Sequence, residues 1–169
     1  MLVTQDQNDL LMRSVVMIKL KEAVKKMEGG KALGLHGFTS NFFHTYWDMV
    51  KGKVLEIVED SRRTGKVLTT FNSTFITLIP KETRAGSPRK FEPIDLCNVI
   101  YKIITKVMAN RLKLLLPFLI SPDQDGFVGG RKILDGIPVA HEVIDSLKVT
   151  KFSSMLIKLK LSKAYDRYD

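Results

Sequence analysis

Helical spacing of apolar residues marks the first third of the chain. From Leu10 to Glu28 the apolar positions recur at the spacing of one helix face, with lysines between them and a glycine pair behind them. This pattern predicts an amphipathic helix that ends at the glycines. The Gly-rich stretch Lys31 to Gly37 predicts a loop, after which Thr39 or Ser40 can cap a second helical region that runs to about Arg63.

A change of pattern after this region predicts the first strand. The segment Phe71 to Ile79 is rich in β-branched and aromatic residues, and Pro80 closes it. Charged and polar residues make Lys81 to Lys90 a loop. Helical periodicity then returns from Asn98 to Leu116, with Pro117 soon after the predicted end.

The last third of the chain predicts a loop, a helix and a strand. A glycine-containing loop precedes the helix-like segment Ile133 to Val149, in which Gly136 and Pro138 predict an irregular first turn or a late start. Apolar and polar residues then alternate from Met155 to Leu161, which predicts a half-buried strand.

Composition restricts the class of protein. The 169 residues are 44% hydrophobic and 27% charged, which fits one globular domain. Lys and Arg number 27 against 18 acids, a net charge of +9 that favours a polyanionic partner, although a basic surface without a partner is the alternative. The single cysteine excludes an internal disulfide and a zinc cluster. The single cysteine also fits a reducing intracellular setting, so we expect a cytoplasmic or nuclear protein. No apolar run approaches the roughly 20 residues that span a bilayer, so we expect no membrane partner.

Six short sequence motifs follow one another along the chain. They are Lys31–Phe38, Phe75–Lys81, Phe91–Asn98, Lys102–Leu112, Gln124–Arg131 and Leu161–Asp166. Each motif is weak alone, but order and spacing together make a strong signal. The chain resembles the fingers and first palm segment of a non-LTR (LINE-type) retrotransposon reverse transcriptase, in the style abundant in plant genomes.

The resemblance implies an α+β fold, a partial right-hand polymerase made of fingers and a first palm strand, largely helical with a small sheet. Residues 1–27 would be an N-terminal helical extension, and residues 28–169 a truncated reverse transcriptase domain. A palm strand whose partner strands are missing would expose hydrogen-bonding edges.

Catalysis in this family requires carboxylates that hold two Mg²⁺ ions. The resemblance places the first metal-binding Asp at the position of Lys160, and the others in an Asp-Asp motif that these 169 residues do not contain. An ammonium group at that position repels divalent cations. Asp166 corresponds to a position beside the catalytic Asp and cannot replace it. We therefore expect no intact catalytic residue, no bound metal and no polymerase activity.

The resemblance also implies contacts with the incoming nucleotide. Lys81 matches a basic residue near the triphosphate, with an exposed strand-end lysine as the alternative. Tyr165 matches the aromatic under the sugar, and a strand-end aromatic that packs on the core explains it equally well. A second basic contact is expected where this chain carries Glu92 and Asp95, which reverses the charge.

Helical spacing groups several cations that would contact the nucleic-acid backbone. Lys102, Lys106 and Lys113 fall on one stripe of the predicted helix, although a solvated face is the commoner explanation. Ile100, Ile104, Val107 and Leu115 form the opposite, apolar arc. Arg111 falls within this arc, where it must find an acid or extend to the edge. Its guanidinium would then join the same interface.

The loop Gln124 to Arg131 matches a segment that lies near the template in the family. Gln124, Gly126, Phe127 and Arg131 fit the family pattern, and glycines allow a close backbone approach. A plain glycine-rich turn is the alternative. His36 is assigned no function, because a lone loop histidine is more often solvated.

These observations predict a fragment of an RNA-directed DNA polymerase that is catalytically inactive. The alternatives are a residual module that binds an RNA or DNA template weakly and electrostatically, and a helical remnant that binds nothing. Oligomeric state is left open by the sequence.

Overall fold

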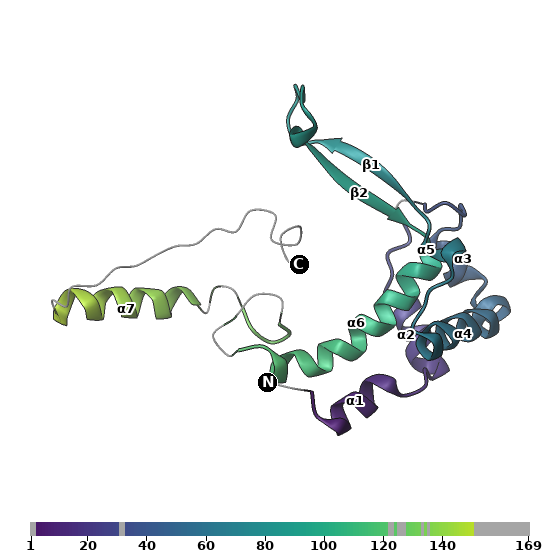
Figure 1. Cartoon of the computed structure of the whole chain (residues 1–169), viewed down its shortest axis with the longest axis horizontal. Helices are drawn as coiled ribbons and strands as arrows, with labels where there is room; N and C mark the ends of the chain where they lie inside the picture. Colours follow the sequence, from purple (N-terminus) through teal and green to yellow (C-terminus); the bar gives the residue numbers. More distant parts are fainter. Residues whose placement is uncertain are drawn as a thin grey trace. The chain divides into compact units, whose positions relative to one another are not determined.

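A computed structural model describes residues 3–30, 33–121, 124, 128–132, 134 and 136–150 of the chain. The chain divides into two compact units, Met1–Ile120 and Ser121–Asp169, and each is described by itself. In the first unit, helices pack together and a two-stranded hairpin extends away from them (Figure 1). This mixture of helices with one small antiparallel sheet confirms the predicted fold class.

Two helices occupy the N-terminal segment in place of the single helix predicted for Leu10–Glu28. Helix α1 spans Gln5–Met12 and helix α2 spans Met17–Lys25. Thr4 begins α1 with a capping box, in which its side chain accepts from the N–H of Gln7 and the Gln7 side chain binds the N–H of Thr4. The prediction of one continuous helix was wrong because side chains from α4 and α6 bind the backbone between Leu11 and Val15.

The second helical region is also divided in two. Thr39, one of the two predicted cap residues, caps helix α3 (Ser40–Thr45) by accepting from the N–H of Phe42. Helix α4 (Trp47–Thr64) follows after a break at Tyr46, and Gly65 ends it with φ +66°. The break separates Phe43 from Trp47, both of which are buried.

The predicted strand and the predicted loop Lys81 to Lys90 are both present, as the first strand and the turn of a hairpin. The predicted strand start was wrong, because Thr69–Asn72 form the short helix α5 and strand β1 begins at Thr74 and ends at Pro80. Its partner, strand β2 (Phe91–Cys97), was not predicted, since Pro93 and two acidic residues interrupt its apolar alternation. A two-stranded sheet has only edge strands, which tolerate proline.

The strands pair antiparallel from Thr74 opposite Cys97 to Pro80 opposite Phe91. At the far end, the N–H of Lys81 donates to the carbonyl of Lys90 over 2.8 Å, and the short 3-10 helix Pro88–Lys90 shapes the turn. The hairpin therefore carries the ten residues 81–90 at its tip.

Helix α6 (Val99–Leu119) follows β2 directly and runs three residues beyond its predicted end. Pro117 lies inside its last turn. The prediction that Pro117 follows the end of the helix was wrong. A proline there removes one helical hydrogen bond, and the N–H of Ile120 still donates to Leu116 over 3.0 Å.

Helices α1, α2, α4 and α5 contact α6. Leu20 and Val24 of α2 and Ile103 of α6 are the largest fully buried side chains. The core comprises Val15, Leu20, Ala23, Val24, Phe43, Trp47, Val54, Val58, Val99, Ile103, Ile104 and Val107. Helix α2 is thus an integral part of the first unit, while the division at residue 27, drawn from family resemblance, stays a prediction.

In the second unit, helix α7 spans Gly136–Thr150, which confirms a late start of the predicted helix. The strand predicted for Met155–Leu161 lies outside the described residues. Among the helices that the structure describes, none combines the length and apolar character that a membrane span needs.

Candidate nucleic-acid interface

The tip of the hairpin concentrates exposed positive charge. Four of its ten residues are basic and one is acidic, and all five side chains are exposed: Lys81, Glu82, Arg84, Arg89 and Lys90. Glu82 forms an ion pair with Lys90. Within the described part of the chain, Lys81, Arg84 and Arg89 have no acidic partner. Binding a phosphate at these three side chains would therefore break no ion pair among the described residues.

The strands hold this tip at a distance from the helices. Seven residue pairs separate the tip from the start of α6, which at ~3.3 Å per residue is roughly 20 Å. Figure 1 shows the hairpin extending from the helices around α6. The predicted binding residue Lys81 therefore lies at the tip, far from the predicted binding lysines of α6.

Glu92 and Asp95 lie on opposite faces of the hairpin. Directly paired residues share a face, and Glu92 pairs with Ile79 while Asp95 pairs with Ile76. Glu92 is one pair from the last strand pair at the tip, and Asp95 is three pairs further in. The two carboxylates do not form one acidic cluster, and Glu92 is the one that bears on the charge of the tip.

The predicted lysine stripe of α6 is partly exposed. Lys113 is exposed, whereas Lys102 and Lys106 are half-buried. On the opposite side, Ile104 and Val107 are buried, as predicted for the apolar arc. The stripe therefore faces away from the core, but only its C-terminal lysine is fully accessible.

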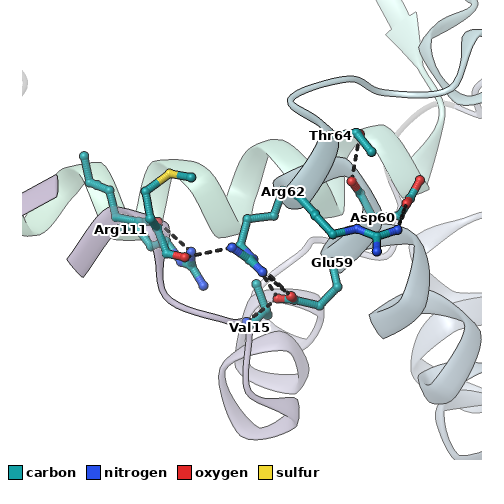
Figure 2. A network of polar contacts seen from close by, with 9 residues as sticks. Val15, Glu59, Asp60, Arg62, Thr64 and Arg111 are labelled. Atoms are coloured by element: carbon teal, nitrogen blue, oxygen red, sulfur yellow. Dashed lines mark hydrogen bonds and ion pairs between the residues drawn. The ribbon is translucent and has the colours of Figure 1, made fainter. Parts of the chain in front are cut away.

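Arg111 binds the backbone of α1. Its guanidinium donates to the carbonyl of Leu11 over 2.7 Å, and Arg62 of α4 donates to the neighbouring carbonyl of Met12 over 2.8 Å (Figure 2). The last carbonyls of a helix have no helical partner, and two arginines from other helices supply one here.

Glu59 completes this network. Its carboxylate accepts from the N–H of Val15 and from the guanidinium of Arg62, at 2.8 Å for the nearest atoms of that ion pair (Figure 2). The hydrogen bond from Arg62 lowers the pKa of Glu59, which keeps the carboxylate charged. Burial, with the positive charge of Arg62, lowers the pKa of Arg111, while the negative charge of Glu59 raises it. The guanidinium of Arg111 already binds the backbone of α1. This contact argues against its predicted role in nucleic-acid binding.

Arg131 and Gln124 are brought together in the second unit. The guanidinium of Arg131 donates to the carbonyls of Gln124, over 2.9 Å, and of Ser121. The Arg131 side chain thus forms hydrogen bonds within its own loop. The other two predicted loop contacts, Gly126 and Phe127, lie outside the described residues.

The residues predicted around the metal and nucleotide, Lys160, Tyr165 and Asp166, also lie outside the described part of the chain. Across residues 3–30, 33–121 and the described positions beyond, no three His, Cys, Asp or Glu side chains gather as metal ligands. Position 160, where the resemblance places the first metal-binding Asp, is not among these residues, so the implied Mg²⁺ site lies outside the described part of the chain.

Sequence reasoning missed Arg84 and Arg89 at the tip and Asn98 at the base of the hairpin. Four cations among the ten residues that follow the predicted strand were a usable signal for the tip. Asn98 gave no comparable signal, because its contacts come from segments 25 to 62 residues away.

Residues 79–168, more than half of the chain, match the family described as reverse transcriptase (RNA-dependent DNA polymerase). The chain belongs to the reverse transcriptase family. This match confirms the resemblance that the motifs predicted.

A relative among known proteins extends the likeness to the whole chain. Over 167 residues the chain is 27% identical to the "Transposon TX1 uncharacterized 149 kDa protein" of Xenopus laevis. The alignment covers 99% of this chain and 13% of that protein. Similarity to a transposon protein supports the predicted retrotransposon origin of this reverse transcriptase segment, whereas the plant style stays a prediction.

Proposed function

We propose that this reverse transcriptase segment binds the phosphate backbone of a nucleic-acid template through the tip of its β1–β2 hairpin. One observation carries the proposal: Lys81, Arg84 and Arg89 are exposed at the end of a projecting hairpin, without an acidic partner among the described residues. Exposed cations attract phosphates by releasing condensed counterions, and this attraction needs no base recognition.

Salt dependence gives a direct test. The affinity of the full chain for a fluorescein-labelled single-stranded RNA is measured by anisotropy between about 50 and 200 mM salt. Replacing all three residues by alanine (K81A/R84A/R89A) should reduce the slope of log affinity against log salt by about 2, at roughly 0.7 per lost phosphate contact.

A matched control removes the same charge elsewhere. Lys19, Lys51 and Lys53 each form an ion pair with an acid three residues away, at 3.1, 2.8 and 2.8 Å. The variant K19A/K51A/K53A should therefore retain most of the parent slope. Equal slopes for the two triple variants would show that only net charge acts, and would contradict a contact at the tip.

We further propose that these 169 residues do not polymerise by themselves. The described residues offer no metal-binding cluster, and the family's first metal-binding Asp is matched by Lys160. Primer extension on an RNA template with Mg²⁺ should give no product, either from the parent or from Lys160→Asp. Chelator-sensitive extension by the parent would contradict this proposal.

A further inference from the structure

Asn98 sits at the junction between the hairpin and the helices. It is 2% exposed, follows the last residue of β2 and precedes the first residue of α6. Its side-chain nitrogen lies 3.0 Å from the carbonyl of Ser73, 3.3 Å from that of Phe71 and 3.4 Å from that of Thr70. The Asn98 side chain thus binds the segment from which β1 starts.

The chemistry of the amide leaves one orientation for this side chain. An amide nitrogen has two hydrogens, so the three carbonyls share them. On the other side, the Oδ1 atom accepts from the N–H of His36 over 3.1 Å. Turning the amide by 180° would set an oxygen against three carbonyl oxygens, so the contacts themselves fix it.

This use differs from the usual role of an asparagine before a helix. Such a residue commonly accepts a hydrogen bond from an N–H in the first turn. Asn98 occupies the N-cap position of α6, yet its side chain makes no cap hydrogen bond. Its hydrogen-bonding groups bind segments that flank the hairpin instead.

The loop before α3 completes the junction. The ring Nε2 of His36 lies 3.0 Å from the carbonyl of Thr70, and the ring packs edge-on against Phe71. Gly34 approaches so closely that a Cβ atom there would lie 2.6 Å from the backbone of Asn98. We name Gly34, His36, Thr70 and Asn98 the hairpin junction.

The helices leave the strands of the hairpin uncovered. Phe75, Ile76 and Leu78 of β1 and Ile94 of β2 are exposed, so neither face of the strands is covered by the helices. With an arm of roughly 20 Å, a rotation of about 10° at the base displaces the tip by about 3.5 Å. A displacement of that size is comparable to the length of a phosphate contact.

We propose that Asn98, supported by His36, is a positioning residue that sets the direction of the hairpin and so the place at which its basic tip meets a polyanion. Asn98 acts through the hairpin and contacts no ligand itself. This inference rests on the proposed function of the tip, but its structural part can be tested without any ligand.

The test measures the distance from the tip to α4. Spin labels are placed at Ala85 in the tip and at Met49 on α4, which is 82% exposed, in the full chain carrying Cys97→Ser. His36→Leu removes the hydrogen bond to Thr70, whereas His36→Gln retains a side-chain amide that can donate to that carbonyl. We expect a broader or shifted distance distribution for His36→Leu and a parent-like one for His36→Gln.

Asn98 itself is tested with a charge-matched control. Asn98→Asp places carboxylate oxygens against three carbonyls, while Asn110→Asp puts the same charge on an exposed position of α6. The distance should change in Asn98→Asp and not in Asn110→Asp, at a temperature where circular dichroism shows intact helices. If Asn98→Asp does not fold, the two His36 variants decide.

Binding is then read separately. RNA affinity should fall several-fold in His36→Leu relative to His36→Gln, although both retain all three tip cations. Unchanged distance distributions in folded His36→Leu and Asn98→Asp would overturn the positioning role, whatever the affinities are. If the distances change while K81A/R84A/R89A binds like its control, the junction positions the hairpin but the proposed function of the tip fails.

Discussion

The backbone N–H of Val15 and the carbonyl of Leu11 have the spacing of a helical hydrogen-bond pair, yet each is bound by a side chain from another helix. Glu59 of α4 accepts from Val15, and Arg111 of α6 donates to Leu11 over 2.7 Å. The two side chains replace the hydrogen bond that a continuous helix would make. They separate α1 from α2 and fasten the break to the core.

Glu59→Gln should destabilise the protein. The amide loses the charge that attracts Arg62 and holds only part of the hydrogen bonds to Val15 and Arg62, so the free energy of unfolding should fall by about 1–3 kcal/mol. Urea denaturation measures the change. Glu56→Gln, one turn earlier, breaks an exposed ion pair with Lys53 and should cost less than about 1 kcal/mol. Equal losses in both variants would contradict the role of Glu59.

The same carboxylate predicts a dependence on pH. The hydrogen bond from Arg62 lowers the pKa of Glu59 below its usual value of 4.5. Because the unfolded chain then takes up the proton first, this stabilisation is complete above about pH 4.5 and is lost as the pH falls through the lowered pKa. The free energy of unfolding should fall less steeply with acid in Glu59→Gln than in the parent.

Salt distinguishes this effect from that of an exposed pair. A hydrogen bond from Lys51 lowers the pKa of Asp48, whose side chain is 86% exposed, whereas that of Glu59 is 27% exposed. At about 1 M salt, where screening acts within about 3 Å, the effect of Asp48→Asn should vanish and that of Glu59→Gln should persist. Loss of both would show that Glu59 is screened like a surface group.

Arg111→Gln separates a structural role from binding. Removing the guanidinium leaves the carbonyl of Leu11 with a weaker donor, so the free energy of unfolding should fall by about 1.5–3 kcal/mol. The salt slope of RNA binding should match the parent. If the slope instead falls by roughly 0.7, the value for one lost phosphate contact, Arg111 belongs to the interface.

Two glycines should respond to alanine with opposite sign. In Gly34→Ala the new Cβ would lie 2.6 Å from the backbone of Asn98, so the junction must open and the protein should be destabilised by about 1–3 kcal/mol. Gly52 lies inside α4, and a Cβ atom added there would meet nothing within 4 Å outside its own helical turn. Gly52→Ala should raise stability by about 0.5–1 kcal/mol, measured by thermal or urea unfolding.

The acids of β2 should act on RNA affinity according to their distance from the tip. Glu92 is three residue pairs nearer the tip than Asp95, a difference of roughly 10 Å and so about one Debye length at 0.1 M salt. Glu92→Gln should therefore increase affinity more than Asp95→Asn does, and the difference should shrink as salt rises. Equal effects would indicate that the RNA does not approach the tip.

Several elements followed from the sequence alone. A cap at Thr39 or Ser40 for α3, the apolar arc with Ile104 and Val107, and an irregular or late start of α7 were all predicted from local pattern. The family was predicted from six motifs in order, and the match over residues 79–168 confirms it. Lys81 was expected either near the triphosphate of the incoming nucleotide or as an exposed strand-end lysine; it is exposed directly after β1, and its contact with a triphosphate stays a prediction.

Tertiary structure decided what local pattern could not. The apolar spacing of residues 10–28 is compatible with one helix, and only the side chains of Glu59 and Arg111, distant in sequence, interrupt it at Leu11 to Val15. Strand β2 exists because β1 pairs with it, despite Pro93 and its acids. Asn98 looks like an ordinary helix cap until the carbonyls of Thr70, Phe71 and Ser73 surround it. Hydrogen bonds between remote segments produce no periodic pattern in a sequence. The neighbours of a residue in the chain do not show which distant group will form a hydrogen bond with it.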